Sequence, residues 1–203
     1  EGNKTFTATW KPVNYTITYN LNGGTYNETT GNISREVEYD TMPEDITPTR
    51  EHYTYEGWTP TLAVATENQT YTALWEPVTY TYIFELEGGN IDGDTEDVEL
   101  SGAYNTDVTN PQDPTKEHYT FEGWDLEVPS KFEGDKTFTA QWTPVTYTYT
   151  FKLDGGKIDD KTEDIELRGV YNTDVTIPKD PVKKHYTFKG WDLEVPSKFK
   201  GNK

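Results

Sequence analysis

The chain contains no cysteine among its 203 residues, so no disulfide can hold a small domain together. Hydrophobic residues make up only 32% of the sequence. No apolar run approaches the roughly 20 residues that are needed to cross a bilayer, and we therefore expect no membrane insertion. The core must be built from side chains other than the usual aliphatic ones.

Basic residues are also scarce, with 18 Lys and Arg against 36 Asp and Glu and a net charge of −18. Nucleic-acid binding needs a basic face, so we expect no such role. Residues 1–77 carry four basic and eleven acidic side chains (−7), residues 78–144 three and fifteen (−12), and residues 145–203 eleven and ten (+1). This polarity favours head-to-tail contact between molecules, although neutral drift on a solvated surface also explains it.

Aromatic residues are abundant at 14%, and together with threonine they favour strands, where β-branched and aromatic side chains pack well. The same motifs recur in the same order with a period of about 65–67 residues, which is the size of a small domain. The landmarks are three Gly pairs, three Gly-Trp pairs and three closing tryptophans: Gly23-Gly24, Gly88-Gly89 and Gly155-Gly156; Gly57-Trp58, Gly123-Trp124 and Gly190-Trp191; Trp10, Trp75 and Trp142.

These landmarks divide the chain into tandem repeats. Residues 13–77, 78–144 and 145–203 are repeats 1, 2 and 3, and repeat 3 lacks its closing strand. Residues 1–12 are predicted to be the closing strand of a preceding repeat or of a neighbouring molecule's repeat. Two-residue, proline-containing linkers between repeats predict a nearly fixed orientation and an elongated rod; they are Lys11-Pro12, Glu76-Pro77 and Thr143-Pro144.

Each complete repeat is predicted to hold four strands with turns between them, and repeat 3 the first three of them. The first, residues 13–21 in repeat 1, alternates apolar and polar residues up to the Gly pair, as a strand with one buried face does. A second strand is expected at residues 36–39, 97–100 and 164–167, and a third at residues 118–124 and its equivalents. The closing strand also alternates: in residues 4–10 the side chains of Phe6, Ala8 and Trp10 share one face.

Taken together, the motifs resemble the Listeria–Bacteroides repeat, the family of the B repeat of internalin-type surface proteins. They are Asn22-Gly23-Gly24, the Tyr-Thr-Phe-x-Gly-Trp of residues 119–124 and the closing strand of residues 137–142, with their copies. The resemblance implies a mainly β, small β-grasp-like unit, strung in tandem on secreted or cell-wall-attached bacterial proteins. It implies a stalk, spacer or adhesive role, an extracellular location and no catalysis.

Residues with catalytic or metal-binding chemistry do not converge in the sequence. His52, His118 and His185 occur once per repeat at the same place, which indicates a structural position beside the third strand. The acidic turn of residues 90–97 alternates oxygen ligands, but it lacks the glycine and the bidentate glutamate of a calcium loop. We therefore expect no cofactor and no metal, while intramolecular isopeptide bonds cannot be placed from the sequence.

The competing function is a carbohydrate-binding module array in which exposed aromatic residues form a platform for sugars. Most aromatic residues fall on the buried phase of the strands, which favours a core role. A host or cell-wall ligand, if there is one, is not indicated by any motif.

The two ends of the sequence complement each other. An unpartnered N-terminal strand is able to complete repeat 3 of the next molecule by strand addition, a contact that propagates into a filament. Alternatively, the chain is part of a longer array in which the next repeat follows covalently. The proposed self-association strand is Thr5, Phe6, Thr7, Ala8, Thr9 and Trp10, and the proposed acceptor end is Phe199, Lys200, Gly201, Asn202 and Lys203.

Overall fold

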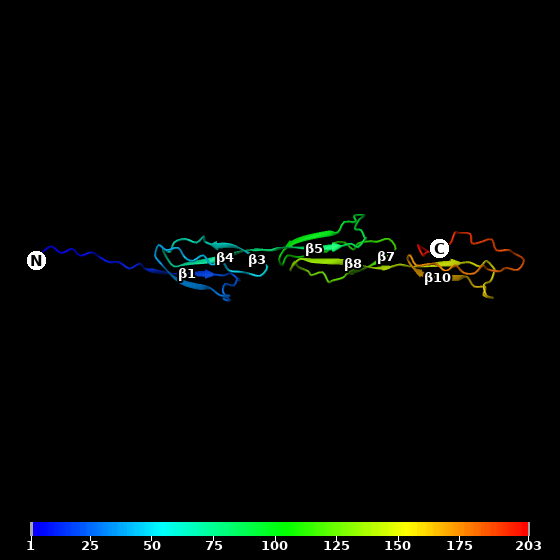
Figure 1. The fold of residues 1–203 in the computed structure, drawn as a ribbon, viewed down its shortest axis with the longest axis horizontal. Helices are drawn as coiled ribbons and strands as arrows, with labels where there is room; N and C mark the ends of the chain where they lie inside the picture. Colours follow the sequence, from blue (N-terminus) through cyan, green and yellow to red (C-terminus); the bar gives the residue numbers. More distant parts are fainter. Residues whose placement is uncertain (1, 203) are drawn as a thin grey trace. The chain divides into compact units, whose positions relative to one another are not determined.

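The computed structural model describes residues 2–202, and this part of the chain is all β (Figure 1). It divides into two compact units, which are described separately. One unit runs up to Thr81 and includes residues 101–108 and 129–135; the other holds residues 82–100, 109–128 and those from Lys136 onward. The strands are β1 (Asn14–Asn20), β2 (Ile33–Glu38), β3 (Tyr53–Thr59), β4 (Gln69–Pro77), β5 (Thr79–Glu85), β6 (Val98–Ala103), β7 (Tyr119–Trp124), β8 (Lys136–Pro144), β9 (Thr146–Phe151) and β10 (Ile165–Val170).

Repeats 1 and 2 each form a mixed four-stranded sheet, in the orders β2-β1-β4-β3 and β6-β5-β8-β7. The first strand of the repeat and the closing strand are the central pair and run parallel, whereas the outer strands β2, β3 and β7 are antiparallel to their neighbours. In both sheets the third strand carries a bulge at a glycine with φ of 114°, Gly57 or Gly123. This left-handed conformation favours glycine because a Cβ atom would be strained there.

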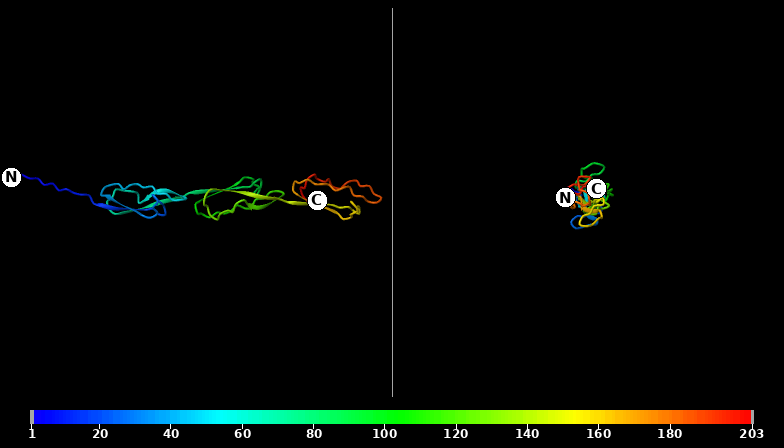
Figure 2. Two further views of the ribbon diagram at one scale, coloured as in Figure 1. Left: turned by 60° about the horizontal axis from the view of Figure 1, so that its bottom comes forward. Right: turned by 90° about the vertical axis from the view of Figure 1, so that its right-hand side faces the viewer.

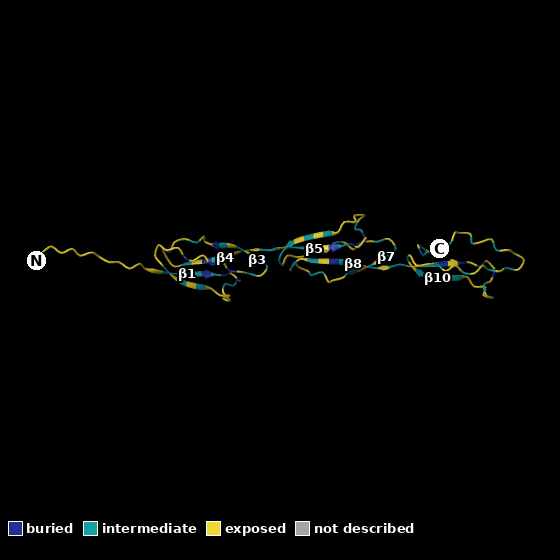
Figure 3. Ribbon diagram, in the orientation of Figure 1, coloured by how far each residue is buried: buried dark blue, intermediate teal, exposed yellow. Residues whose placement is uncertain are grey.

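The core of repeat 1 lies on the face predicted from the alternation. Ile17, Tyr19 and Leu21 of the first strand and its extension are fully buried (Figure 3). They pack with Tyr71 and Ala73 of β4. Two loops, residues 40–51 and 60–68, cover the sheet. They contribute the buried side chains of Ile46 and Ala65 to the core.

The mainly β prediction is therefore confirmed. Residues 2–202 contain no helix, so the β-grasp detail is not confirmed, and no segment of that part is a helix long and apolar enough to cross a membrane. The elongated rod stays a prediction.

Repeat 3 differs from the other two because it holds only the two-stranded sheet β10-β9. Residues 186–191, the equivalent of β7, are not a strand. In repeats 1 and 2 this segment pairs with the closing strand. Among the described residues of repeat 3 that partner is missing, and without it the segment has no ladder to join.

Several sequence-based expectations need correction. Residues 2–12 form no strand and are exposed throughout, and this blue segment extends away from the first sheet (Figure 2). A lone strand has no neighbour to satisfy its backbone groups, so the alternating pattern of residues 4–10 is not sufficient by itself. Val13, placed on the buried face, is 62% exposed. The second strands are longer than expected: β2 begins three residues earlier, at Ile33, and β6 and β10 run on to Ala103 and Val170.

The proline-containing linkers are also not separate connections. Pro77 and Pro144 are the last residues of β4 and β8, and a single residue, Val78 or Val145, separates each from the first strand of the next repeat.

Candidate functional site: the repeat junctions and an open groove

The junction between repeats 1 and 2 is built around the backbone of Val78. Its N–H donates to the carbonyl of His52 in repeat 1 at 2.9 Å, and its carbonyl accepts from the N–H of Tyr104 in repeat 2 at 2.8 Å. The connecting residue is thereby bonded to both repeats through its two backbone groups. Both backbone groups of the connecting residue are therefore satisfied within the junction.

The side chain of His52 completes this junction. Its ring stacks on Tyr104 with centroids 4.1 Å apart, and its Nδ1 lies 2.8 Å from the hydroxyl of Tyr80. Tyr53 contacts the edge of the same Tyr104 ring at 5.7 Å. His52 has φ of 65°, which turns the chain so that its ring faces the next repeat.

The junction between repeats 2 and 3 repeats this arrangement. Val145 donates to the carbonyl of His118 at 2.8 Å and accepts from Tyr171 at 2.8 Å. The His118 ring stacks on Tyr171 at 4.1 Å, and its Nδ1 lies 2.9 Å from the Tyr147 hydroxyl. Because the same contacts recur at both junctions, the arrangement is a regular feature of how consecutive repeats connect. We call each set of one His, two Tyr and one Val the His–Tyr–Tyr junction.

Residues equivalent to one side of the junction are exposed near each end of the described chain. The histidine side is exposed in repeat 3, and the Val–Tyr side is exposed in repeat 1. His185 has φ of 69°, like the other two histidines, but it is exposed, and the neighbouring Tyr186 is 73% exposed. In repeat 1, Val13 and Tyr39 occupy the positions of Val78 and Tyr104 and are 62% and 53% exposed. Tyr39 already donates its N–H to the carbonyl of Val13 at 2.8 Å, so this half of the junction is preformed.

The closing strand anchors repeats 1 and 2 through a tryptophan. The indole N–H of Trp142 donates to the carbonyl of Leu86 at 3.1 Å, and Trp75 donates to Leu21 at the same distance. The ring lies directly against the Gly pair: a Cβ atom built on Gly89 would be 2.5 Å from the Trp142 ring. The second glycine of the pair is therefore required by close approach of the tryptophan.

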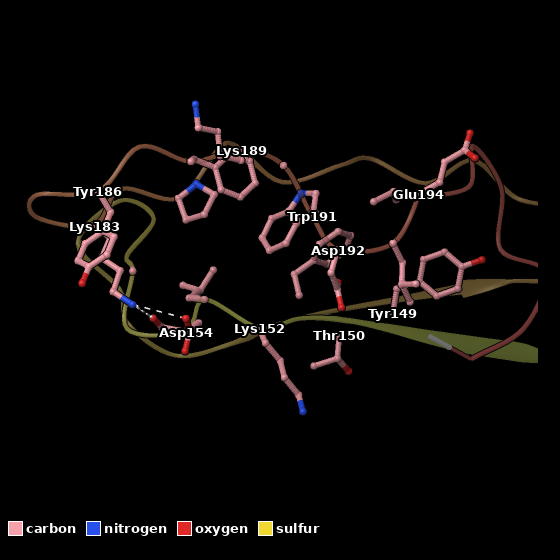
Figure 4. Close-up of a pocket in the computed structure, with 18 of the residues that line it drawn as sticks. Tyr149, Thr150, Lys152, Asp154, Lys183, Tyr186, Lys189, Trp191, Asp192 and Glu194 are labelled. Atoms are coloured by element: carbon pink, nitrogen blue, oxygen red, sulfur yellow. Dashed lines mark hydrogen bonds and ion pairs between the residues drawn. The ribbon is translucent and has the colours of Figure 1, made fainter.

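In repeat 3 the place of the closing strand is an open groove of ≈ 720 Å³ (Figure 4). We call this volume the repeat-3 groove. One wall is β9 with residues that follow it, and the other is residues 186–196. Trp191 lies between the two walls and contacts Phe151 edge-on at 4.9 Å, as Trp124 contacts Phe84 in repeat 2 at 5.0 Å. The groove therefore keeps its own aromatic contacts without the closing strand.

Other features of the groove are also preformed. Gly190 has φ of 112°, matching the bulge glycines Gly57 and Gly123 of the paired strands. Lys183 at one end of the groove donates to the carbonyl of Asp154 at 2.5 Å and lies 5.1 Å above the Tyr186 ring. The equivalent lysine in repeat 2, which is Lys116, lies above both Tyr119 and the closing Trp142.

The structure describes the predicted acceptor end up to Asn202. Phe199 is buried against Tyr149, and the Asn202 side chain accepts from the N–H of Thr148 at 3.0 Å. Lys200 donates its N–H to the Tyr149 hydroxyl at 3.0 Å. Gly201 is half-buried between them, and Lys203 lies outside the described residues. Repeat 2 has the equivalent hydrogen bond: the N–H of Thr81 donates to the side chain of Asp135, which directly precedes β8.

The predicted self-association strand lies at the other end, and the structure does not bring it to the acceptor end. Phe6 and Trp10 are 89% and 91% exposed, and Thr5, Thr7, Ala8 and Thr9 between them are exposed as well.

The acidic turn considered for calcium has structural hydrogen bonds instead. Asn90 accepts from Gly93 at 3.1 Å, Asp94 accepts from Glu96 at 3.0 Å, and Asp97 accepts from Leu86 at 2.8 Å. Within residues 2–202 no group of three or more metal-ligating side chains converges.

One buried polar group stands out in repeat 1. The hydroxyl of Tyr55 is buried without a hydrogen-bond partner, and burial, with the nearby Asp45 carboxylate adding to it, raises the pKa of Tyr55 to about 12. Repeats 2 and 3 have phenylalanine at the same position, Phe121 and Phe188.

The sequence analysis placed the histidines correctly as structural residues but missed their contacts across the junctions. A signal was available: each His precedes a Tyr, and each repeat carries a Tyr two residues after its first Val and another Tyr just after its second strand. The contacts join residues up to 53 positions apart, such as His118 and Tyr171, which alternation cannot pair.

Comparison with known proteins matches all three repeats to one family. Residues 15–76, 80–145 and 147–196 match the Listeria-Bacteroides repeat domain. A putative membrane protein of Evansella cellulosilytica is 29% identical over 92% of this chain, and a putative Gly-rich membrane protein of the same organism is 27% identical over 93%. Internalin H of Listeria monocytogenes is 30% identical over 57% of the chain. The chain spans 29%, 23% and 21% of the lengths of these relatives.

Proposed function

Because the chain belongs to the Listeria-Bacteroides repeat family, we propose that it is a non-catalytic structural and adhesive array on the outer surface of a bacterial cell. The names of its relatives support this location, since two are described as membrane proteins and one as an internalin. All three relatives are longer than the chain, which fits a spacer that carries or positions other domains.

The observation that carries the proposal is the His–Tyr–Tyr junction. Within each described unit, a connecting valine is bonded through both of its backbone groups, and a His ring is sandwiched against the next repeat. Residues with specific chemistry are thus used to join repeats rather than to line a reaction site. An array that must transmit a load or hold a distal domain away from a surface requires such joints.

The competing function, a carbohydrate-binding array, is favoured by exposed aromatic side chains. The largest of these among residues 2–202 are Phe6, Trp10, Tyr39 and Tyr186. The counterparts of Phe6 and Trp10 in repeat 2 belong to the closing strand, and the counterparts of Tyr39 and Tyr186 contact a His–Tyr–Tyr junction. Their exposure is therefore explained by missing repeat partners rather than by a platform for sugars.

Small-angle X-ray scattering on the chain and on a His52→Asn, His118→Asn double variant tests the proposal. Asparagine tolerates positive φ, so the substitutions remove ring contacts with little backbone cost. We expect the double variant to scatter as a more variable ensemble while both proteins remain folded by circular dichroism. Equal scattering would contradict a joining role for the His rings, and saturable binding to insoluble polysaccharides would favour the carbohydrate-binding alternative.

A further inference from the structure

We propose that the parallel pair of the first strand and the closing strand is a mechanical clamp, which keeps a repeat folded while the chain is pulled along its length. The mechanical clamp is β1 with β4 in repeat 1 and β5 with β8 in repeat 2, the two repeats that contain all four strands. The inference rests on the proposed structural role and goes beyond it, because it assigns resistance to tension to one set of hydrogen bonds.

The direction of the load follows from the order of the strands. Tension that passes along the polypeptide reaches a repeat through its first strand and leaves it through its closing strand. In repeat 1 these strands are β1 and β4, which pair side by side and run parallel (Figure 1). The load therefore pulls the start of one strand and the end of its neighbour in opposite directions and slides the strands past each other. The hydrogen bonds of the ladder lie across this direction, so they resist sliding together.

The connection between repeats delivers tension directly to the clamp. β4 ends at Pro77 and β5 begins at Thr79, so the single residue Val78 joins one closing strand to the next first strand. Both backbone groups of Val78 are hydrogen bonded, at 2.9 and 2.8 Å. No flexible linker is present here that could straighten and absorb the load before it reaches the strands.

The ladder in repeat 1 is short, and side chains extend it at both ends. Four residues of β1 pair with four residues of β4. Before this overlap, the side chain of Asn68 accepts from the N–H of Thr16 at 2.8 Å. After it, the side chain of Asn22 donates to the carbonyl of Ala73 at 3.0 Å. Each of these bonds joins the two segments that tension would separate.

The closing tryptophan adds a further link beyond the ladder. Trp75 of β4 donates its indole N–H to the carbonyl of Leu21, which follows β1, at 3.1 Å. Its ring lies against the second glycine of the pair, where a Cβ atom on Gly24 would be only 2.4 Å away. This bond therefore also connects the two loaded segments.

Repeat 2 has the same set of links with different side chains. Its ladder again contains four residue pairs. Asp135 takes the place of Asn68 and accepts from the N–H of Thr81 at 2.8 Å. Trp142 donates to the carbonyl of Leu86 at 3.1 Å. The bond into the first strand is kept although an amide has become a carboxylate, which indicates that the link itself is what both repeats require.

The outer strands are bypassed by the load while the clamp holds. β2 and β3 lie at the two edges of the sheet in repeat 1, outside the central pair. Their contacts, such as the 3.2 Å approach between the hydroxyls of Thr18 and Ser34, contribute to equilibrium stability but do not join β1 to β4. Resistance to tension and equilibrium stability should therefore depend on different bonds.

Optical tweezers test the clamp by pulling repeat 1 of the full chain in two directions. The chain has no cysteine, so handles attach only at introduced ones. Asn14→Cys with Glu76→Cys loads the start of β1 against the end of β4 and slides the strands. Asn14→Cys with Glu67→Cys loads the starts of both strands and peels them apart. All three replaced side chains are exposed, and circular dichroism checks that both variants fold.

The two directions should give different rupture forces at the same loading rate. We expect a force about twofold or more higher for sliding, because hydrogen bonds that break together add their contributions, whereas peeling breaks them one at a time. Equal forces, or a lower force for sliding, would overturn the mechanical clamp.

Two further variants, each made in the sliding pair, locate the resistance. Asn68→Ala removes the hydrogen bond to Thr16 between the clamp strands. Ser34→Ala is the matched control, because it removes the contact with Thr18 between β1 and an outer strand, also at an exposed side chain. We expect a lower rupture force for Asn68→Ala alone. An unchanged force in Asn68→Ala, or an equal loss in both variants, would overturn the assignment of the load to this pair of strands.

Failure of the clamp and failure of the structural role can be told apart. Equal rupture forces in the two directions, together with altered scattering from the His52→Asn, His118→Asn variant, would remove the clamp and leave the role of the junctions intact. Unequal rupture forces with unaltered scattering would support the clamp and remove the joining role of the His rings.

Discussion

Repeats 2 and 3 share most of their sequence, yet one is closed by a strand and the other is open. In repeat 2, β8 lies between β5 and β7, and its Phe138 and Ala140 are buried. In repeat 3 the equivalent space is a groove, and residues 186–191 are not a strand although they read Tyr-Thr-Phe-Lys-Gly-Trp against Tyr-Thr-Phe-Glu-Gly-Trp in β7. The difference shows that this segment becomes a strand only when the closing strand supplies a ladder.

The comparison also shows what the open repeat keeps. Phe151 and Trp191 retain their edge-on contact, and Tyr149 retains its contact with Phe199. A repeat thus consists of a preformed half, which is the β9–β10 pair with its loops, and a half that depends on one added strand.

The largest effect is expected from Trp142→Ala, which removes the anchor of the closing strand in repeat 2. The substitution leaves a cavity beside Phe121 and deletes the hydrogen bond to Leu86, and should cost about 3–4 kcal/mol of unfolding free energy. Chemical denaturation measures the loss. Trp10→Ala, at a side chain 91% exposed, is the control and should leave the stability of the monomer unchanged; a similar cost for both would contradict the comparison.

A smaller difference is expected between Gly89→Ala and Gly156→Ala. Both new methyl groups meet a leucine carbonyl at 3.0 Å, but only the first also meets a tryptophan ring, at 2.5 Å. Gly89→Ala should therefore cost about 1–3 kcal/mol, as overpacking does, and Gly156→Ala much less. Equal costs in thermal unfolding would show that the tryptophan moves aside freely.

Substitutions of His118 and His185 should also differ in how much unfolding free energy they cost. His118→Asn removes the stack on Tyr171 and the hydrogen bond to Tyr147, and should cost about 1–2 kcal/mol. His185→Asn has the same backbone conformation but an exposed ring, and should be close to neutral. Denaturation of the two variants side by side isolates the junction contacts, and an equal loss would place the cost in the backbone instead.

The smallest expected effect, and the only stabilising one, is that of Tyr55→Phe. Removing a buried hydroxyl that has no partner should add about 1 kcal/mol. Because the pKa of Tyr55 is raised to about 12 in the folded state, the unfolded chain loses this proton first as the pH rises, so the stability should fall between about pH 10 and 12. Tyr55→Phe should lessen that fall in alkaline denaturation, while an unchanged pH dependence would exclude Tyr55 as its source.

Much of the architecture could be predicted from the sequence because its signals are local or periodic. The buried face of the first strand and, in repeats 1 and 2, the position of the third strand follow from alternation and from the Gly-Trp landmarks. Residues 4–10 form no strand within this chain, because a strand needs a partner that the pattern cannot supply, and their role as the closing strand of another repeat stays a prediction. Alternation missed the His–Tyr–Tyr junctions and the orphan hydroxyl of Tyr55, since both depend on contacts between residues far apart in the chain.

The most direct test of the central claim is hydrogen exchange at the backbone amides of residues 186–191. These would be compared in the 203-residue chain and in a chain extended after Lys203 by the sequence of residues 137–144. The account predicts that the extension slows exchange in this segment to the level of residues 119–124 in repeat 2, because the added strand fills the groove. Exchange that stays as fast as in the unextended chain would contradict the claim that a closing strand binds in the groove.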